Sequence, residues 1–194
     1  MFRSWRLQLR EADEAFRAGR LDEAERLLHQ GELSRYLPGK RLSGEVAGEI
    51  ARRGRLRFMS GETEAGWRDL ERACKLGDQS ENVLAVKQEM MGQALRDTEN
   101  ALVAGETGSV ISRLESLQKR HSDCEAIRVL LEVARRLESA RHLSRRGKFV
   151  DAQPQLEAAA TLRPDLAVVQ QRLAACREDQ RTSRELAEKL HRVL

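Results

Sequence analysis

The chain has 194 residues, of which 40% are hydrophobic, 34% are charged and only 4% are aromatic, and its net charge is +4. Alanine, leucine, glutamate and arginine dominate, and because all four favour helix the composition predicts an all-α protein. The three cysteines form no CxxC pair and no apolar run is as long as a membrane span, which argues against a zinc site, a disulfide framework and a transmembrane protein.

The first predicted element is a helix that starts near the N-terminus and ends at Gly19. Its apolar side chains step by three and four and form one stripe: Phe2, Trp5, Leu9, Ala12 and Phe16. Arginines flank the stripe, so the helix has the features of a basic amphipathic segment that lies on an acidic membrane. Because the stripe is continuous, packing against a following helix is the favoured interpretation.

The middle of the chain is predicted to contain one loop and two long helices. Residues 32–43 contain Pro38-Gly39-Lys40 and are predicted as a loop. Residues 80–104 and 122–146 are each predicted as a single helix of about seven turns. Each of these segments begins with serine, which is the expected N-cap.

The last predicted elements are a short helix and a long one. The short helix is expected to start near Asp151, so that Pro154 falls in its first turn, where proline removes no internal hydrogen bond. From Asp165 to Leu194 the chain again has the pattern of a long first helix. A further turn glycine would fall near position 190 and is missing, which predicts either a capping helix or the front portion of a longer protein. The apolar ending favours the second.

Four glycines recur along the chain at intervals of 42, 44 and 42 residues: Gly19, Gly61, Gly105 and Gly147. Each is expected to end a first helix with a positive φ. The residues nine positions later are Leu28, Leu70, Leu114 and Leu156. Residues seven positions before each glycine (Ala12, Gly54, Thr98, Ala140) and five after it (Ala24, Gly66, Val110, Ala152) are small. They are expected to let paired helices approach closely. The pattern predicts one helical-repeat domain over 1–194, with units 2–36, 43–77, 80–121 and 122–163 and a terminal helix over 165–194.

The segments Gly19-Arg20-Leu21-Asp22-Glu23-Ala24 and Gly147-Lys148-Phe149-Val150-Asp151-Ala152 resemble the inter-helix turn of a tetratricopeptide repeat. The likeness continues in unit four through Leu156, Ala159 and Arg163-Pro164, and in unit two through Gly54, Phe58, Gly61, Gly66 and Ala73. It implies an α-solenoid of about four antiparallel helix pairs plus a C-terminal helix. The family period is about 34 residues, so the longer period here implies lengthened first helices. The chain is also similar to N-terminal helical regions of large bacterial signalling proteins, some of which carry a forkhead-associated domain downstream.

The sequence contains no recognised catalytic motif. P-loop, GxGxxG, HExxH and GxSxG patterns are absent. His121-Ser122-Asp123-Cys124 brings a histidine, an acid and a thiol together, but a helix cap is the favoured interpretation of this segment. The other histidines have no ligand partner at i+4. The sequence therefore predicts no catalysis, no metal and no cofactor.

Tetratricopeptide arrays usually bind ligands on the concave face of their first helices. By position, the resemblance selects Asp13, Arg17, Arg55, Met59, Glu99, Val103, Arg141 and Arg145. The expected partner-binding residues among these are Arg17, Arg55, Met59, Arg141 and Arg145. The family's carboxylate clamp needs asparagines at positions that here hold other residues, so this clamp is not expected. Arginine forks bind carboxylates and phosphates, so the expected partner is a protein or an acidic or phosphorylated peptide. Solvated helix faces are the alternative.

Nucleic-acid binding is the rival function. Residues 35–57 hold seven basic and two acidic side chains and residues 135–148 hold six and one, a net charge of +5 in each. Aromatic side chains for base stacking are limited to Tyr36 and Phe58. The favoured prediction is therefore a non-catalytic scaffold that binds protein partners. Its cysteine usage indicates a reducing, cytoplasmic setting.

Overall fold

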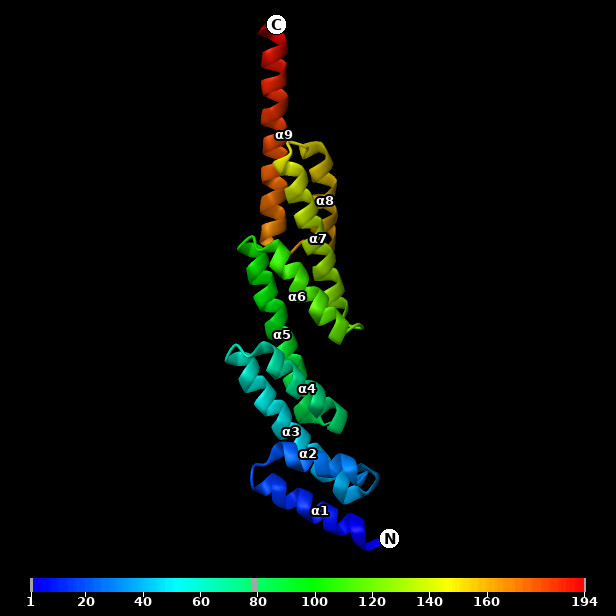
Figure 1. The fold of residues 1–194 in the computed structure, drawn as a ribbon. Helices are drawn as coiled ribbons and strands as arrows, with labels where there is room; N and C mark the ends of the chain where they lie inside the picture. Colours follow the sequence, from blue (N-terminus) through cyan, green and yellow to red (C-terminus); the bar gives the residue numbers. More distant parts are fainter. Residues whose placement is uncertain (1, 78–79, 194) are drawn as a thin grey trace. The chain divides into compact units, whose positions relative to one another are not determined.

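The computed structural model describes residues 2–77 and 80–193, and over these residues it contains nine α-helices, one short 3-10 helix and no strand (Figure 1). The predicted all-α class is confirmed. None of the described helices is long and apolar enough to cross a bilayer. The chain divides into two compact parts, called here the N-terminal body (residues 1–93) and the C-terminal body (residues 94–194).

The N-terminal body consists of two helix pairs and the start of a further helix. Its elements are α1 (Phe2–Arg17), α2 (Leu21–Gln30), η1 (Leu33–Arg35), α3 (Leu37–Met59), α4 (Thr63–Gly77) and the first half of α5 (Glu81–Val103). Helix α1 packs on α2, α3 packs on α4, and α2 and α1 both touch α3. Figure 1 shows these two hairpins in blue and cyan.

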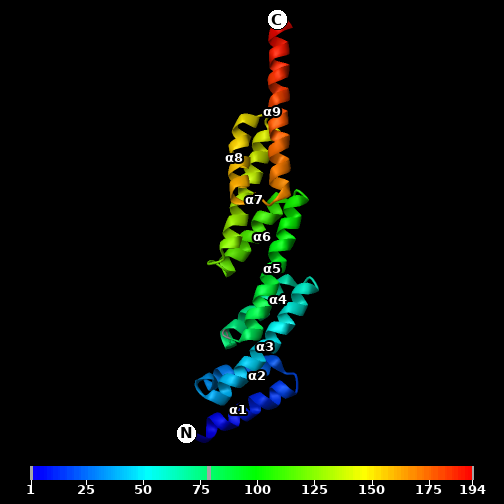
Figure 2. The same cartoon turned by 180° about the vertical axis from the view of Figure 1, so that it is seen from behind.

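The C-terminal body continues with the remainder of α5. Its further elements are α6 (Thr107–Arg120), α7 (Glu125–Arg145), α8 (Phe149–Leu162) and α9 (Ala167–Val193). Helix α7 packs between α6 and α8, and α8 packs on α9. Figure 2 shows from behind that α9 continues past the end of α8, and the side chains of residues 181–192 are exposed along that extension.

The four recurring glycines form four equivalent turns. Their φ angles are 74° at Gly19, 93° at Gly61, 86° at Gly105 and 70° at Gly147, as expected for glycines that end a helix in the left-handed region. The residue after each glycine donates its backbone N–H to the carbonyl five residues earlier; the donors are Arg20, Glu62, Glu106 and Lys148. This shared hydrogen bond closes each first helix in the same way.

The residues at fixed offsets from the glycines are buried. The four leucines nine positions later all lie in the core, as do the small residues seven positions before and five positions after each glycine. Helices α3 and α4 approach each other closely. A Cβ atom at Gly54 would lie 2.9 Å from the carbonyl oxygen of Gly66, and one at Gly66 would lie 2.7 Å from that of Gly54. The predicted close approach is therefore confirmed in this pair.

The predicted loop over residues 32–43 is wrong. The segment holds η1 and the first two turns of α3, which begins at Leu37 with Pro38 in its first turn. Proline suits that position because its N–H would have no helical acceptor there. Gly39 also favours this packing, because a Cβ atom there would lie 2.0 Å from the carbonyl oxygen of Leu33. Proline and glycine here start a helix on η1 and do not break one.

Two predicted helix starts differ from the structure. The N-cap of α7 is Cys124, and the hydroxyl of Ser122 donates to Asp123 at 3.2 Å and caps no helix. Helix α8 starts at Phe149, two residues before the expected start, so Pro154 lies inside the helix. The carbonyl of Val150 consequently has no helical N–H donor, and this cost is moderated by the exposure of Val150. Helix α5 does begin directly after Ser80.

Candidate functional site

A groove of about 630 Å³ lies between α1 and α3, the first helices of the first two predicted units. We call it the α1–α3 groove. From α1 it is lined by Arg6, Leu9, Arg10, Asp13 and Arg17, and from α3 by Leu37, Pro38, Arg41, Leu42 and Glu45. Within each helix these residues recur every three or four positions, so one face of each helix forms a wall. Two of the positions that the family resemblance selected, Asp13 and Arg17, lie here.

The α1–α3 groove combines apolar side chains with unpaired cations. Leu9 and Leu42 line it, and Leu37 lies at its rim with 78% of its surface exposed. No described carboxylate pairs with Arg6 or Arg41. The other arginines of this wall are neutralised within α1: Arg17 meets Asp13 at 2.9 Å and Arg10 meets Glu14 at 2.8 Å. The groove therefore offers two available cations beside an apolar surface.

An aromatic pair stands beside this groove. The rings of Trp5 and Tyr36 stack with their centroids 4.5 Å apart and their planes 9° from parallel. The Arg6 guanidinium lies 5.4 Å from the Trp5 ring centroid. Tyr36 is the N-cap residue of α3, so the stack joins the start of α1 to the start of α3.

Ala12 on the predicted apolar stripe is buried, as the packing interpretation requires, while the side chain of Phe2 lies outside the described residues.

A second cavity, of about 600 Å³, adjoins this groove, and we call it the basic cavity. Leu37 and Arg41 line both. The other residues of the basic cavity are Ser34, Lys40, Ser43, Gly44, Leu76, Gly77 and Ser80. Its walls come from η1, the first turns of α3, the end of α4 and the residue before α5. No acidic residue is among these described lining residues.

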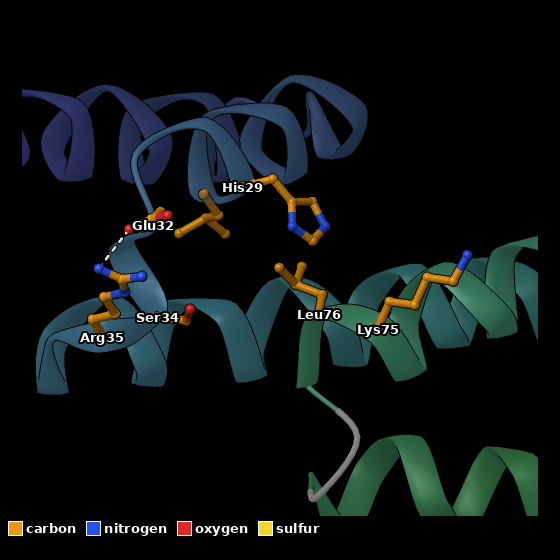
Figure 3. Close-up of a pocket in the computed structure, with 7 residues that line it drawn as sticks. His29, Glu32, Ser34, Arg35, Lys75 and Leu76 are labelled. Atoms are coloured by element: carbon orange, nitrogen blue, oxygen red, sulfur yellow. Dashed lines mark ion pairs between the residues drawn. The ribbon is translucent and has the colours of Figure 1, made fainter.

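A third and smaller cavity, of about 260 Å³, shares Ser34 and Leu76 with the basic cavity. Figure 3 shows His29 of α2 facing Leu76 of α4, with the Glu32–Arg35 ion pair on the other side. The two charged groups of that pair meet at 2.8 Å. Because Glu32 is paired with Arg35, the charge of this arginine is already compensated within the cavity wall.

The expected partner-binding residues on the end of α3 lie apart from the α1–α3 groove. Arg55 donates to Glu89 of α5 at 3.1 Å, and Met59 ends α3 with 63% of its surface exposed. Arg55 follows Arg41 by 14 residues, or about 21 Å along a helix. Neither residue lines the groove. The structure thus separates them from Arg17.

The expected residues of the fourth unit lie in the C-terminal body. Arg141 donates to the Thr107 hydroxyl at 3.3 Å and meets Glu138 at 3.5 Å, while Thr107 itself donates to Glu138. Burial, assisted by the positive charge of Arg141, lowers the pKa of the neighbouring Arg172. Arg145 is exposed and has no described partner.

The two remaining concave-face positions are Glu99 and Val103 of α5. Glu99 accepts from Arg163 at 2.9 Å, and Val103 is exposed.

Most cations of the two basic segments are paired within the protein. In residues 35–57 the paired cations are Arg35, Arg52, Arg53, Arg55 and Arg57, whereas Lys40 and Arg41 have no described partner. In residues 135–148 the paired cations are Arg135, Arg136 and Arg141. The charge that is free to meet nucleic-acid phosphates is therefore well below the +5 that each sequence segment carries.

An arginine–carboxylate cluster joins α2, α3 and α4; it consists of Asp22, Glu25, Arg53, Arg57, Asp69 and Arg72. Asp69 is at its centre, 2% exposed. Arg53 donates to it at 2.8 Å and Arg57 at 2.7 Å. Hydrogen bonds from Arg53 and then Arg72 lower the pKa of Asp22 to about 2. The sequence patterns did not indicate this cluster, and its only local signal is the i,i+3 spacing of Asp22–Glu25 and Asp69–Arg72.

The structure assembles no metal site among the residues it describes: no three His, Cys, Asp or Glu side chains are grouped to hold an ion there. His121 and Cys124 flank the turn between α6 and α7, as the C-cap residue of one helix and the N-cap residue of the other. The predicted lack of catalysis remains a prediction.

Comparison of the chain with protein-family models, with curated proteins and with solved structures gives no match. Function is therefore inferred from the repeated glycine turns and from the chemistry of the cavities.

Proposed function

We propose that this chain is a tetratricopeptide-like α-solenoid and serves as a non-catalytic scaffold that binds a partner protein. Four equivalent glycine turns support the solenoid, together with the buried residues at fixed offsets from them. The partner-binding surface in this proposal is the α1–α3 groove, and the ligand is an acidic peptide segment with apolar side chains.

The proposal depends on one observation: the same groove holds apolar side chains and cations without a described carboxylate partner. Arg6 and Arg41 have no described carboxylate partner there, and each can hold a carboxylate through two parallel hydrogen bonds. Leu9 and Leu42 offer contact surface for an apolar anchor. Among the expected partner-binding residues, Arg17 lines this groove. We propose that Arg55 and Met59 add contacts elsewhere on the N-terminal body, and Arg141 and Arg145 on the C-terminal body.

Nucleic-acid binding is less well supported. Five of the seven cations in residues 35–57 form ion pairs within the protein. An ion pair must be broken or shared before its arginine can neutralise a phosphate. A mobility shift with duplex DNA at two salt concentrations tests this rival, which predicts tight, salt-sensitive and sequence-independent binding.

Peptide binding is tested by fluorescence anisotropy with short synthetic peptides that carry aspartate, glutamate and leucine. Arg6→Glu should weaken binding of the acidic peptides by about tenfold, which is about 1.4 kcal/mol. Arg26→Glu is the matched control, because Arg26 is an exposed arginine of α2 outside the groove. Equal peptide affinities for the wild type and Arg6→Glu would show that the peptide does not bind in the α1–α3 groove.

A further inference from the structure

We propose that Arg141 and Arg172 hold one carboxylate of an acidic partner segment at the turn between α5 and α6. We call this the two-arginine site. The inference rests on the proposed function and deepens it, because that proposal already gives Arg141 to partner contacts. It adds Arg172, which neither the sequence pattern nor the family resemblance indicated, and it names the group that the two arginines recognise.

Two arginines from different helices reach the same turn. Arg141 of α7 donates to the hydroxyl of Thr107, the first residue of α6, at 3.3 Å. The guanidinium Nη2 atom of Arg172, on α9, lies 3.8 Å from the position that a Cβ atom of Gly105 would take. Gly105 precedes Thr107 by two residues, so both guanidinium groups lie at the start of α6. All four residues belong to the C-terminal body.

The charges of the two arginines act on each other. Burial first, and the positive charge of Arg141 second, lower the pKa of Arg172, while Glu138 acts in the opposite direction. Arg172 is half-buried and makes no hydrogen bond or ion pair with a described residue. A half-buried guanidinium beside a second one costs the fold free energy, because water screens the repulsion only in part.

Among the described residues, Glu138 is the carboxylate that acts on both arginines. It meets Arg141 at 3.5 Å, and it also accepts from Thr107. Glu106, the other acidic residue of this turn, is exposed and accepts from the Ser109 hydroxyl at 3.3 Å. The two arginines thus share Glu138, and one positive charge is left without a counter-charge.

The undescribed side chains do not supply the missing charge. Asp78 is the only acidic residue among them. It precedes the start of α5, whereas Gly105 follows the end of this helix of 23 residues, which is about 34 Å long. Three chain steps separate Asp78 from α5 and span about 10 Å at most. Asp78 therefore cannot pair with Arg172.

A carboxylate fits this charge balance. One uncompensated positive charge matches a monoanion, and guanidinium groups hold a carboxylate through parallel hydrogen bonds. Arg145 favours a peptide as the source of the carboxylate. It lies one turn further along the same face of α7, is exposed and has no described partner. A segment with a second acidic residue can reach this further cation, and an isolated small carboxylate cannot.

Titration of the full chain, followed through the arginine Nε–Hε signals in two-dimensional NMR, detects such binding even when it is weak. The probes are a capped peptide of alternating glutamate and glycine and, as a free small carboxylate, glutarate. Tighter binding of the peptide is the expected result and identifies a protein segment as the ligand. Equal affinities would overturn the assignment to a partner segment, and the absence of saturable shifts with both probes would overturn the site.

An exchange at Arg172 locates the site. Arg172→Gln should weaken binding of the glutamate peptide by about tenfold, because one of the two guanidinium groups is lost. Arg177→Gln is the matched control, since Arg177 belongs to the same helix and pairs with Glu157 instead. Unchanged affinity in Arg172→Gln, or an equal loss in Arg177→Gln, would contradict the site.

A second readout needs no ligand. Arg172→Met should raise the Tm of the free chain by about 2 °C, because an apolar side chain of similar length removes the repulsion from Arg141. The same variant should lose affinity for the peptide. A lower Tm would show that the charge of Arg172 stabilises the fold, which is contrary to the proposal.

This inference and the α1–α3 groove can fail separately, because Arg6 belongs to the N-terminal body and Arg172 to the C-terminal body. Loss of binding of the glutamate peptide in Arg172→Gln but not in Arg6→Glu supports the two-arginine site, whatever the outcome for the groove. Loss in Arg6→Glu alone assigns the peptide to the groove and refutes the two-arginine site.

Discussion

Basic residues have different roles in the two halves of α3. In the second half, Arg53 and Arg57 donate to a carboxylate that is almost fully buried, and they join three helices. In the first half, Lys40 and Arg41 have no described partner and line open cavities. Both halves carry basic residues in sequence, so residue type alone does not separate cations that join helices from cations that have no partner among the described residues. The position of the nearest carboxylate in space separates them.

The largest expected effect comes from removing the central carboxylate of the paired half. Asp69→Ala should lower the free energy of unfolding by about 3 kcal/mol, because it leaves three partly buried arginines without their shared partner. Chemical denaturation measures the loss. The matched change is Glu49→Ala, which breaks the exposed pair with Arg52 and should cost about 0.3 kcal/mol. Equal losses in the two variants would contradict the distinction between buried and exposed pairs.

Two glycine substitutions test the same difference between the two halves of α3. Gly66→Ala should destabilise the protein by about 2 kcal/mol, because the new Cβ would lie 2.7 Å from a carbonyl oxygen of α3. Gly44→Ala, in the unpaired half of α3, should raise stability by about 0.5 kcal/mol, because nothing lies within 4 Å of the added Cβ and the unfolded chain loses entropy. Thermal melts of both variants test the opposite signs, and a loss at both positions would contradict the open packing around Gly44.

A pH dependence of stability is expected at the rim of the arginine–carboxylate cluster. The pKa of Asp22 is lowered from 3.8 to about 2 in the folded protein, so its contribution is complete above pH 3.8 and is lost as the pH falls through about 2. The contribution is about 1 kcal/mol or less, because the side chain is 64% exposed and solvent screens the pair. Denaturation curves of Asp22→Asn between these pH values should show a flatter decline than wild type.

The repeat was predictable from sequence because its determinants are local. A glycine that ends a helix, and a leucine nine residues later that fills the core, act within one helix hairpin, and the structure confirms both. The start of α3 was not predictable, since Pro38-Gly39 has the composition of a turn until the contact of Gly39 with the Leu33 carbonyl is known.

The candidate sites were predictable only in part. The family resemblance selected Asp13 and Arg17, and both residues line the α1–α3 groove. The partners of the arginines were not predictable, because Arg53 meets Asp69 and Asp22, which lie 16 and 31 residues away in sequence. The approach of Arg172 to Arg141 depends on the packing of α9, which no local pattern records.

The stack of Trp5 on Tyr36 gives this protein an optical reporter of its own. The chain has two tryptophans, and the other, Trp67, is buried edge-on against Phe58 between α3 and α4. Indole emission from Trp67 therefore follows unfolding, whereas emission from Trp5 follows changes at Arg6, which contacts the Trp5 ring and lines the α1–α3 groove. In a Trp67→Phe variant, quenching or a spectral shift would register ligand arrival without any attached dye.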